Sequence, residues 1–314
     1  MYAYDNYRKV KGIIESRRLN AINESEERNI EVASRSDEIR DIDRELRGVG
    51  LLLFKTACNG GDITPIKERN LALSEKRRKA LKELGLPEDY TEVHYTCPLC
   101  SDTGFVGTKM CSCFREMLIT ENIKSSGMGT LIEKQSFDNF DLNNYKDNKE
   151  NYARMKHNFN EAKNFADNFG KIPSTLLFIG KTGTGKTHLS TAIAKAVIER
   201  GFEVLYDSAQ NIVSAFENDK FKSGYGPYEP QADKYMECDL LILDDLGTEF
   251  VNQFTVSCLY NLINTRQNKG LSTLISTNLS PEELRTKYED RIYSRITGTD
   301  SKILLFVGKD LRLK

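Results

Sequence analysis

The 314-residue sequence has no long hydrophobic run, no secretory signal at its start and no excess of positive charge. No apolar segment approaches the roughly 20 residues that a membrane-spanning helix requires, which excludes an integral membrane protein. The first five residues lack the basic segment followed by an apolar one that directs export, so we expect a cytoplasmic protein without a membrane partner. Because the formal net charge is −1 at pH 7, any binding to nucleic acid must use a local patch.

Disulfide bonds are not expected either. The seven cysteines are an odd number in a chain without an export signal, which argues for reduced thiols, some of them bound to metal. Cys58, Cys238 and Cys258 stand alone in apolar surroundings, and we expect them to be buried as small hydrophobic side chains. The other four cysteines lie close together in the sequence.

These four are Cys97, Cys100, Cys111 and Cys113. The tight turn of a Cys-x2-Cys pair lets two thiolates converge on one tetrahedral ion, so the cluster predicts a structural zinc site. The second pair has a single intervening residue, which leaves His94 open as an alternative ligand. We favour Zn²⁺ over an iron–sulfur cluster because nothing else in the sequence suggests redox chemistry. A loop-rich segment of this length cannot fold on core burial alone.

The amino-acid composition and the hydrophobic pattern change along the chain and predict four regions. Residues 1–90 are dense in charged residues with few helix breakers and read as an α-helical hairpin, with a turn at 59–62 and an apolar stripe along its first helix. That stripe either fills the hairpin or is offered to another protein. Residues 91–118 form the cysteine-rich module, and the polar segment 119–150 reads as a linker.

Residues 151–314 alternate helical patterns with short apolar runs. Such alternation predicts a parallel sheet with helices on both faces. The runs expected to be its strands are 175–179, 203–206, 240–243, 274–277 and 303–307. The fold class is therefore α/β in the second half of the chain, behind an α-helical first half with a small zinc module.

Residues 180–187 read GKTGTGKT, between a predicted strand and a predicted helix. Glycines let the backbone curl so that its N–H groups face phosphate oxygens, and the helix N-terminus adds partial positive charge. This context predicts a phosphate-binding loop, with Lys186 at the β- and γ-phosphates and the Thr187 hydroxyl on Mg²⁺.

The second part of the predicted nucleotide site is an apolar strand that ends in Asp244 and Asp245. It would deliver carboxylates to the edge of the sheet where ligands bind. We expect Asp244 to hold Mg²⁺ through water and Asp245 to polarise an attacking water, which implies hydrolysis. Asn278, at the tip of the next strand, is either a phosphate sensor or an ordinary turn residue, and the neighbouring motifs favour the sensor.

Arg291 and Arg295 are four residues apart and share one helix face. They either form surface ion pairs or offer an arginine finger to the nucleotide of a neighbouring subunit. Few residues follow Arg295, so we expect no helical lid domain over the nucleotide. Self-association through the Arg291 face would then close the site.

Together these motifs resemble the AAA+ (ASCE) ATPases, and among them the replicative helicase loaders of the DnaC/DnaI type. The residues that carry the resemblance are GKTGTGKT followed by His188 and Leu189, LILDDLGTE at 241–249, STNL at 276–279 and the segment 289–295. The resemblance implies a five-stranded sheet in the order 5-1-4-3-2, Asn278 as sensor 1 and Arg291 as a finger acting on a neighbour. It also implies an N-terminal region that grips the hexameric DNA helicase, with the ATP state controlling release onto single-stranded DNA. The DnaI-like branch also carries an N-terminal zinc module.

The expected cofactors are ATP, Mg²⁺ and structural Zn²⁺, and the expected activity is ATP hydrolysis. We expect the nucleotide to be held by Gly180, Thr182, Gly183, Thr184, Gly185, Lys186, Thr187, His188 and Asp244, and the catalytic residues to be Asp245, Asn278 and Arg291. Residues 220–228 mix cations with aromatics and are a candidate contact for single-stranded DNA, or a solvated loop. The alternative functions are an IstB-type ATPase that assists a transposase and an interaction module whose ATP site is only structural.

Overall fold

The computed structural model describes residues 4–222 and 230–313 of the chain. It contains two compact units, one formed by Lys11–Phe114 and the other by Met1–Val10 together with Arg115–Lys314. Helices α1 (Tyr4–Arg35) and α4 (Ser112–Ser125) contribute residues to both units. Among the described residues, no helix combines the length and the apolar character needed to cross a bilayer.

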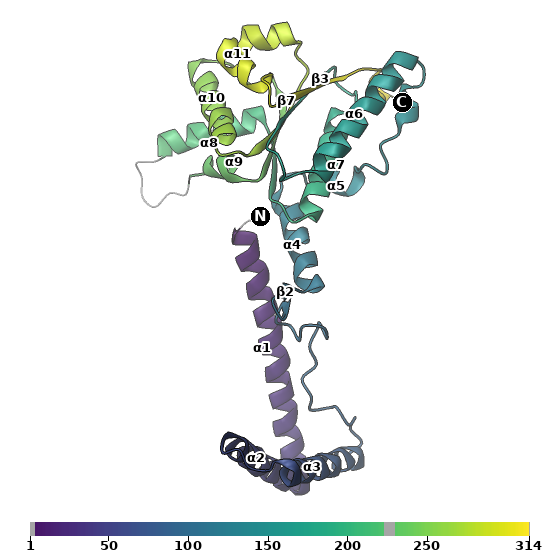
Figure 1. Cartoon of the computed structure of the whole chain (residues 1–314), viewed down its shortest axis with the longest axis vertical. Coiled ribbons are helices and arrows are strands. Elements are labelled where there is room, and N and C mark those ends of the chain that lie inside the picture. The colour runs from purple at the N-terminus through teal and green to yellow at the C-terminus, as the bar shows by residue number, and fades with distance from the viewer. Residues whose placement is uncertain (1–3, 223–229, 314) are drawn as a thin grey trace. The chain divides into compact units, whose positions relative to one another are not determined.

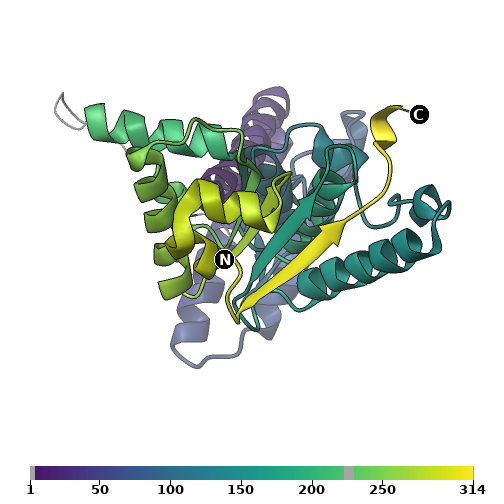
Figure 2. The ribbon, with the colours of Figure 1, turned by 90° about the horizontal axis from the view of Figure 1, so that it is seen from above.

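The larger unit is built on a five-stranded parallel sheet. Its strands are β3 (Thr175–Gly180), β4 (Val204–Ser208), β5 (Leu240–Leu246), β6 (Ser272–Thr277) and β7 (Ser301–Phe306). They lie in the order β4-β5-β6-β3-β7, which confirms the predicted sheet and, with its strands numbered one to five along the chain, the implied order 5-1-4-3-2. Figure 2 shows β7 in yellow alongside β3.

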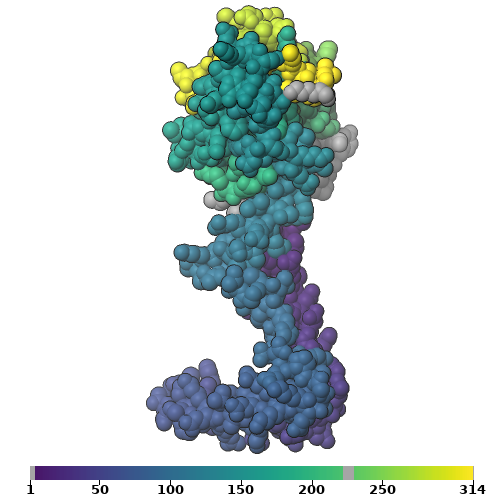
Figure 3. All heavy atoms as spheres, turned by 90° about the vertical axis from the view of Figure 1, so that its right-hand side faces the viewer, coloured from purple at the N-terminus to yellow at the C-terminus, as the bar shows by residue number. Residues whose placement is uncertain are grey.

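Helices cover both faces of this sheet. Leu176 and Phe178 of β3 belong to one core cluster, whereas Leu177 and Ile179 belong to another, as expected for a strand buried on both sides. Figure 1 shows α6 (Lys149–Asp167) and α7 (Lys186–Glu199) on one side of the sheet. The other side carries α8 (Ala209–Lys222), α9 (Asp233–Glu237), α10 (Gln253–Asn268) and α11 (Pro281–Ile296). Helix α6 lies on the face turned to the viewer in Figure 3.

The segment 119–150 is part of the sheet unit rather than an extended connection. It contains the second half of α4, the short helix α5 (Leu131–Lys134) and the 3-10 turn η1 (Leu142–Tyr145). Its buried side chains join the core cluster on the α6–α7 side: Met128, Ile132, Phe140 and Tyr145. The backbone N–H of Tyr206 in β4 donates to the Ser126 carbonyl (2.7 Å). The polar composition of this segment reflects its exposed residues, while a few spaced apolar side chains anchor it.

The smaller unit contains the predicted helical hairpin, formed by α2 (Asp37–Cys58) and α3 (Thr64–Glu83). The predicted first helix is interrupted at Ser36, whose extended backbone and side chain cap α2 by accepting from the Ile39 N–H (3.2 Å). The apolar stripe mainly fills the hairpin, since Ile39, Ile42 and Val49 are buried. Cys58 at the end of α2 is exposed, contrary to expectation, whereas Cys238 and Cys258 are buried.

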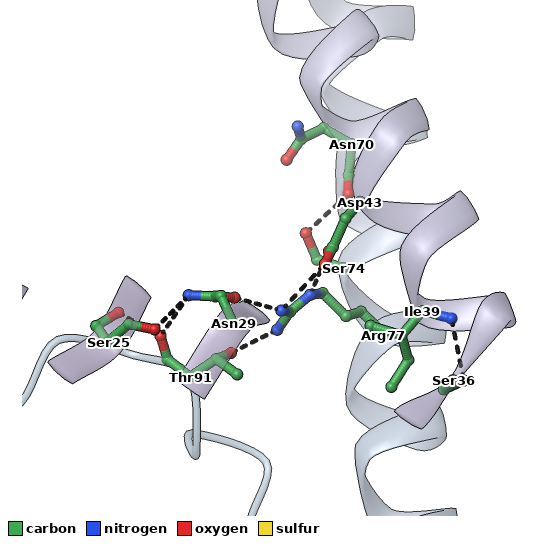
Figure 4. Close-up of polar contacts among 9 residues, drawn as sticks. All are labelled: Ser25, Asn29, Ser36, Ile39, Asp43, Asn70, Ser74, Arg77 and Thr91. Atoms are coloured by element: carbon green, nitrogen blue, oxygen red, sulfur yellow. Dashed lines mark hydrogen bonds and ion pairs between the residues drawn. The ribbon is translucent and has the colours of Figure 1, made fainter. Parts of the chain in front are cut away.

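The side chain of Arg77, which is mostly buried, joins helices α1, α2 and α3, as Figure 4 shows. From α3, Arg77 donates through Nε to Asp43 Oδ1 of α2 (2.6 Å) and through Nη2 to Asn29 Oδ1 of α1 (2.7 Å). Its Nη1 donates to Thr91 Oγ1 in the segment after α3 (2.6 Å). The guanidinium thus fixes the register of the hairpin against α1. The cysteine module follows, with the two-residue strands β1 (Phe105–Val106) and β2 (Lys109–Met110).

Candidate nucleotide site and metal centre

The phosphate loop connects β3 to α7 at the carboxyl edge of the sheet. Gly183 (φ 77°) and Gly185 (φ 95°) have left-handed backbone that glycine adopts without strain. At Gly185 a Cβ would also lie 2.7 Å from the Tyr145 hydroxyl oxygen. The loop geometry therefore depends on these glycines even before any ligand is considered.

Lys186 opens α7 and lies over its own loop. Its Nζ donates to the carbonyl oxygens of Gly180 (2.6 Å) and Lys181 (3.0 Å), and the residue is 6% exposed. Burial lowers the pKa of Lys186, while the nearby carboxylates of Asp245 and Asp244 act in the opposite direction. The ammonium is thus held beside the loop by hydrogen bonds to two neutral carbonyl oxygens. A phosphate oxygen can take the place of these carbonyls as its partner.

A cavity of about 350 Å³ brings most of the predicted site residues together. It is lined by Thr182, Gly183, Gly185, Lys186, Thr187, His188, Asp245 and Asn278. Gln135, Thr248, Leu311 and Arg312 complete its wall. Three further predicted residues do not line the cavity: Gly180 ends β3, Thr184 is a buried residue of the phosphate loop itself, and Asp244 is buried in β5.

Asp244 is fixed by hydroxyl groups from the two neighbouring strands. Tyr206 of β4 and Ser276 of β6 donate hydrogen bonds to its two carboxylate oxygens. Burial, reinforced by the Asp244 charge, raises the pKa of Tyr206, which keeps the phenol protonated as a donor. This arrangement orients the carboxylate at the edge of the sheet.

Asp245 faces the cavity instead of the core. Its backbone is left-handed (φ 52°), and its N–H donates to Ser276 Oγ (3.0 Å). Burial, followed by the charge of Asp244, raises the pKa of Asp245, which makes the carboxylate a better base than an ordinary aspartate. Asn278 lines the same cavity just after β6, so an amide and a carboxylate meet there.

His188 is held by the segment before the sheet. Its Nε2 lies 2.9 Å from Asn139 Oδ1 and 3.1 Å from the Ser136 carbonyl oxygen, two acceptors that require a proton on this nitrogen. Its ring meets Phe140 edge to face, with centroids 5.1 Å apart. Burial lowers the pKa of His188, so the ring is neutral near pH 7.

Residues 310–312 lie against the phosphate loop. The Leu311 N–H donates to the Gly183 carbonyl (2.9 Å), and a Cβ at Gly183 would overlap the Asp310 carboxylate. Arg312, in the 3-10 turn η2 (Leu311–Leu313), pairs with Asp310 at 3.3 Å and lines the cavity. Burial dominates the pKa shifts of Lys186 and Asp245; the Arg312 charge adds to the lowering at Lys186 and opposes the rise at Asp245.

Arg291 is absent from this cavity. It lines a second hollow of about 600 Å³, together with Tyr260, Arg295 and the first residues of β3 and β7, Thr175 and Ser301. This hollow is therefore at the amino edge of the sheet, and β3 alone separates the two edges by about 16 Å at 3.3 Å per residue. Arg291 of one chain cannot serve the nucleotide cavity of that same chain.

The four clustered cysteines come together in the smaller unit. Their sulfur atoms all lie within 4.8 Å of one another, with Cys97 Sγ 3.8 Å from Cys111 Sγ and Cys100 Sγ 3.6 Å from Cys113 Sγ. Tetrahedral Zn²⁺ with Zn–S bonds of about 2.3 Å requires sulfurs about 3.8 Å apart. The donor set therefore fits a zinc ion. Within the described part of the chain, the group of side chains close enough to share a metal ion consists of these four cysteines and does not include His94.

The surroundings of the cysteines also suit a metal. The Cys100 backbone N–H lowers the pKa of the Cys97 thiol to about 7, which favours the thiolate that binds metal, whereas burial raises the pKa of the Cys113 thiol. The buried carboxylate of Asp102 accepts from the N–H groups of Thr96 (2.7 Å) and Cys97 (2.9 Å), which fixes the first turn. A zinc ion bound here would link the two cysteine pairs across β1 and β2.

Two functional contacts escaped the sequence analysis. Tyr206 and Ser276 bond Asp244, yet they are 38 and 32 residues away from it in the chain. Only the strand order makes β4 and β6 the neighbours of β5. The local signal for Ser276 was its place two residues before Asn278, at the end of a strand that reaches the site edge.

The parallel sheet order, with the phosphate loop opening α7, defines a P-loop protein of the AAA+ class. The family described as IstB-like ATP binding protein matches residues 128–297, more than half of the chain. The chain belongs to this ATP-binding family.

Several known proteins are similar to this chain. Replicative helicase loader DnaC of Escherichia coli (strain K12) is 25% identical over 192 residues, 61% of this chain and 75% of that protein. The uncharacterized protein YdaV of the same strain is 29% identical over 185 residues, 58% of this chain and 70% of that protein. A crystal structure of the DnaC helicase loader aligns with a TM-score of 0.48 at 21% identity, covering 56% of this chain and 98% of that one.

Proposed function

We propose that this protein is an ATP-hydrolysing loader that binds a replicative hexameric helicase through its N-terminal region and helps to place it on single-stranded DNA. The observation that carries the ATPase proposal is one cavity lined by Lys186, Asp245 and Asn278. It offers a cation for phosphate, a base for water and an amide that can sense the γ-phosphate. The relatives named as replicative helicase loaders support the choice of cargo.

ATP binding would begin with an exchange of partners at Lys186. The ammonium now bonds the carbonyls of Gly180 and Lys181, and in the complex it would turn to the β- and γ-phosphates. The N–H groups at the start of α7 would hold the phosphates from the other side. Thr187 and Asp244 would hold Mg²⁺, which supplies charge neutralisation of the phosphates.

Hydrolysis would use Asp245 and Asn278. The raised pKa of Asp245 suits it to accept a proton from an attacking water, and a positioned base of this kind contributes typically about 10²–10⁴-fold in rate. Asn278, at the same edge, would orient that water or the γ-phosphate. Ser276 bonds both Asp244 and the Asp245 backbone, and would keep the two carboxylates in register.

Arg291 would complete the site of a neighbouring copy. Its position at the amino edge of the sheet supports action in trans, because its own nucleotide cavity opens at the opposite edge. An arginine finger stabilises the charge that develops on the transferred phosphoryl group. Self-association would therefore control the rate of ATP hydrolysis. Binding of several copies of this chain to one ring-shaped helicase would bring Arg291 of one copy to the nucleotide cavity of the next.

The smaller unit would supply the contact with the helicase, stiffened by Zn²⁺ at Cys97, Cys100, Cys111 and Cys113. The expected DNA contact at 220–228 falls largely on residues 223–229, which lie outside the described part of the chain. Within the described part, the Lys220 ammonium lies 4.8 Å from the Phe254 ring centroid. A cation beside an aromatic ring is consistent with stacking on single-stranded bases.

ATP binding and turnover are measured separately on the full chain with stoichiometric helicase and single-stranded DNA. We expect Lys186→Ala to lose nucleotide binding, and Asp245→Asn to bind ATP while its kcat falls by about 100-fold or more. Lys195→Ala, on α7 but outside the cavity wall, is the matched control and should behave as wild type. Absence of turnover in the wild type under these conditions would refute the ATPase proposal.

The alternative cargo is a transposase, because the matching family is the IstB-like one. Native mass measurement of the chain mixed with a replicative hexameric helicase or with a transposase, with and without ATP, separates the two. We expect an ATP-dependent complex with the helicase. A complex with the transposase alone would assign the chain to transposition.

A further inference from the structure

Tyr260 of α10 lies against both arginines of α11. The Arg291 Cζ is 5.5 Å and the Arg295 Cζ 5.0 Å from the centroid of its ring. The Arg295 Nη2 also donates to the Tyr260 hydroxyl oxygen (3.0 Å). One half-buried ring therefore contacts two guanidinium groups from the neighbouring helix.

The backbone around Arg291 explains why such a support is needed. Helix α11 breaks at Glu289, which has φ 64° and ψ 163°, so the turn that carries Arg291 is not aligned by the first part of the helix. Arg291 Nε pairs with Glu289 Oε2 (3.1 Å), but both side chains are at least half exposed. Exposed ion pairs restrain a side chain weakly. The ring of Tyr260 is the more rigid partner.

A second tie links the same two helices. Gln267 lies seven residues after Tyr260, on the same face of α10. Its side-chain Nε2 donates to the Arg295 carbonyl oxygen (2.9 Å). The guanidinium groups line the hollow of about 600 Å³ at the amino edge of the sheet, where Ser294 and Thr299 add hydroxyl groups. The wall thus presents two guanidinium groups, with the single carboxylate of Asp300 also in the lining.

We propose that Tyr260 is a positioning residue for hydrolysis in trans: its ring holds Arg291 in the direction in which an adjoining copy presents its phosphates. The proposal rests on the proposed function, in which Arg291 serves the neighbour's nucleotide. Tyr260 touches no substrate itself. It acts by limiting the directions open to the guanidinium, so its loss should affect kcat rather than the affinity of the chain for its own ATP.

Three substitutions test this in the full chain assembled with helicase. Tyr260→Leu and Tyr260→Gln both remove the aromatic face, whereas Tyr260→Phe keeps the face and removes the hydroxyl. Losing a guanidinium–ring contact from the transition state corresponds to about 2- to 30-fold in rate, so we expect kcat to fall within that range in the first two variants at unchanged KM. Tyr260→Phe should recover most of the loss. Unchanged ATP affinity of each isolated variant verifies its fold.

Mixing subunits distinguishes positioning in trans from damage within the variant's own site. Lys186→Ala subunits should bind no ATP but still offer an intact Tyr260 and Arg291 to a neighbour. Adding them to Tyr260→Leu should restore turnover several-fold, as it should for Arg291→Ala. Restoration for Arg291→Ala but not for Tyr260→Leu overturns the inference.

The remaining outcomes are also decisive. If the wild type turns over and Arg291→Ala does not, full activity of Tyr260→Leu and Tyr260→Gln overturns the role of Tyr260 while the proposed function stands. If Arg291→Ala is as active as the wild type, the finger itself is refuted, and Tyr260 has nothing to position. Absence of wild-type turnover refutes the proposed function first.

Discussion

The Tyr288 hydroxyl donates a hydrogen bond to the Glu249 carboxylate, and both residues are almost fully buried. Glu249 lies in the turn that follows Asp245, and its other oxygen accepts from the Gly247 N–H (3.0 Å). Tyr288 immediately precedes the break of α11 at Glu289. The bond therefore joins the turn beside the nucleotide cavity to the helix that carries Arg291.

Tyr288→Phe should destabilise the sheet unit by about 1.5–3 kcal/mol, because it removes a hydrogen bond to a buried charged group. Thermal unfolding of the full chain measures the loss. Tyr293→Phe, on the same helix but only partly buried, is the control and should change stability by less than about 0.5 kcal/mol. Equal stability of the two variants would show that Glu249 finds another donor.

Arg77→Met should loosen the smaller unit. The substitution leaves Asp43, Asn29 and Thr91 without their shared donor, and breaking a largely buried ion pair costs about 3–5 kcal/mol. We expect faster amide hydrogen exchange in α2 and α3. Arg69→Met, which removes the exposed pair with Glu45, is the matched control and should leave exchange unchanged. Equal protection in both variants would contradict the clamp.

Cys97→Ser should release zinc and unfold the cysteine module, because structural zinc supplies about 10–16 kcal/mol of apparent binding free energy. The measurement is metal content by elemental analysis, with helicity followed in parallel. Cys58→Ser, an exposed thiol outside the cluster, is the control and should keep its full metal content. One equivalent of zinc retained by Cys97→Ser would remove this cysteine from the ligand set.

His188 should make the protein less stable as the pH falls. Its pKa is lowered in the folded state by burial, so below the ordinary value of 6.5 the unfolded chain binds the extra proton first. The stability associated with a neutral His188 is therefore complete above pH 7 and declines from about 6.5 downward, until the folded state is protonated as well. His188→Asn should show a smaller decline between pH 7.5 and 5.5 in denaturant titrations. Parallel curves for the two proteins would contradict this.

The phosphate loop, the acid-bearing strand and the cysteine cluster could be recognised from the sequence because each is a short, contiguous pattern. The strand order followed only from the family resemblance. Ser36 could have been found, since a serine followed by two acidic residues is a typical start of a helix. The segment 119–150 has the polar composition of a linker, whereas its packing depends on the few apolar side chains that reach the core.

The contacts of Tyr206 and Ser276 with Asp244 could not be predicted in the same way. They arise from register across β4, β5 and β6, a tertiary property that no local pattern carries. The same holds for Tyr260, because its partners Arg291 and Arg295 belong to another helix. The residues that hold a site residue in place come from other strands and helices, so they can be identified only from the folded structure.

The pairing of Arg312 with Asp310 beside the phosphate loop has a consequence for affinity. An incoming polyanion and the aspartate compete for one guanidinium, so occupancy replaces an existing ion pair instead of adding a new one. Fewer small ions are then displaced per nucleotide taken up. The dissociation constant should therefore vary less steeply with salt concentration than the number of cations around the cavity suggests, and replacing Asp310 by asparagine should steepen that dependence.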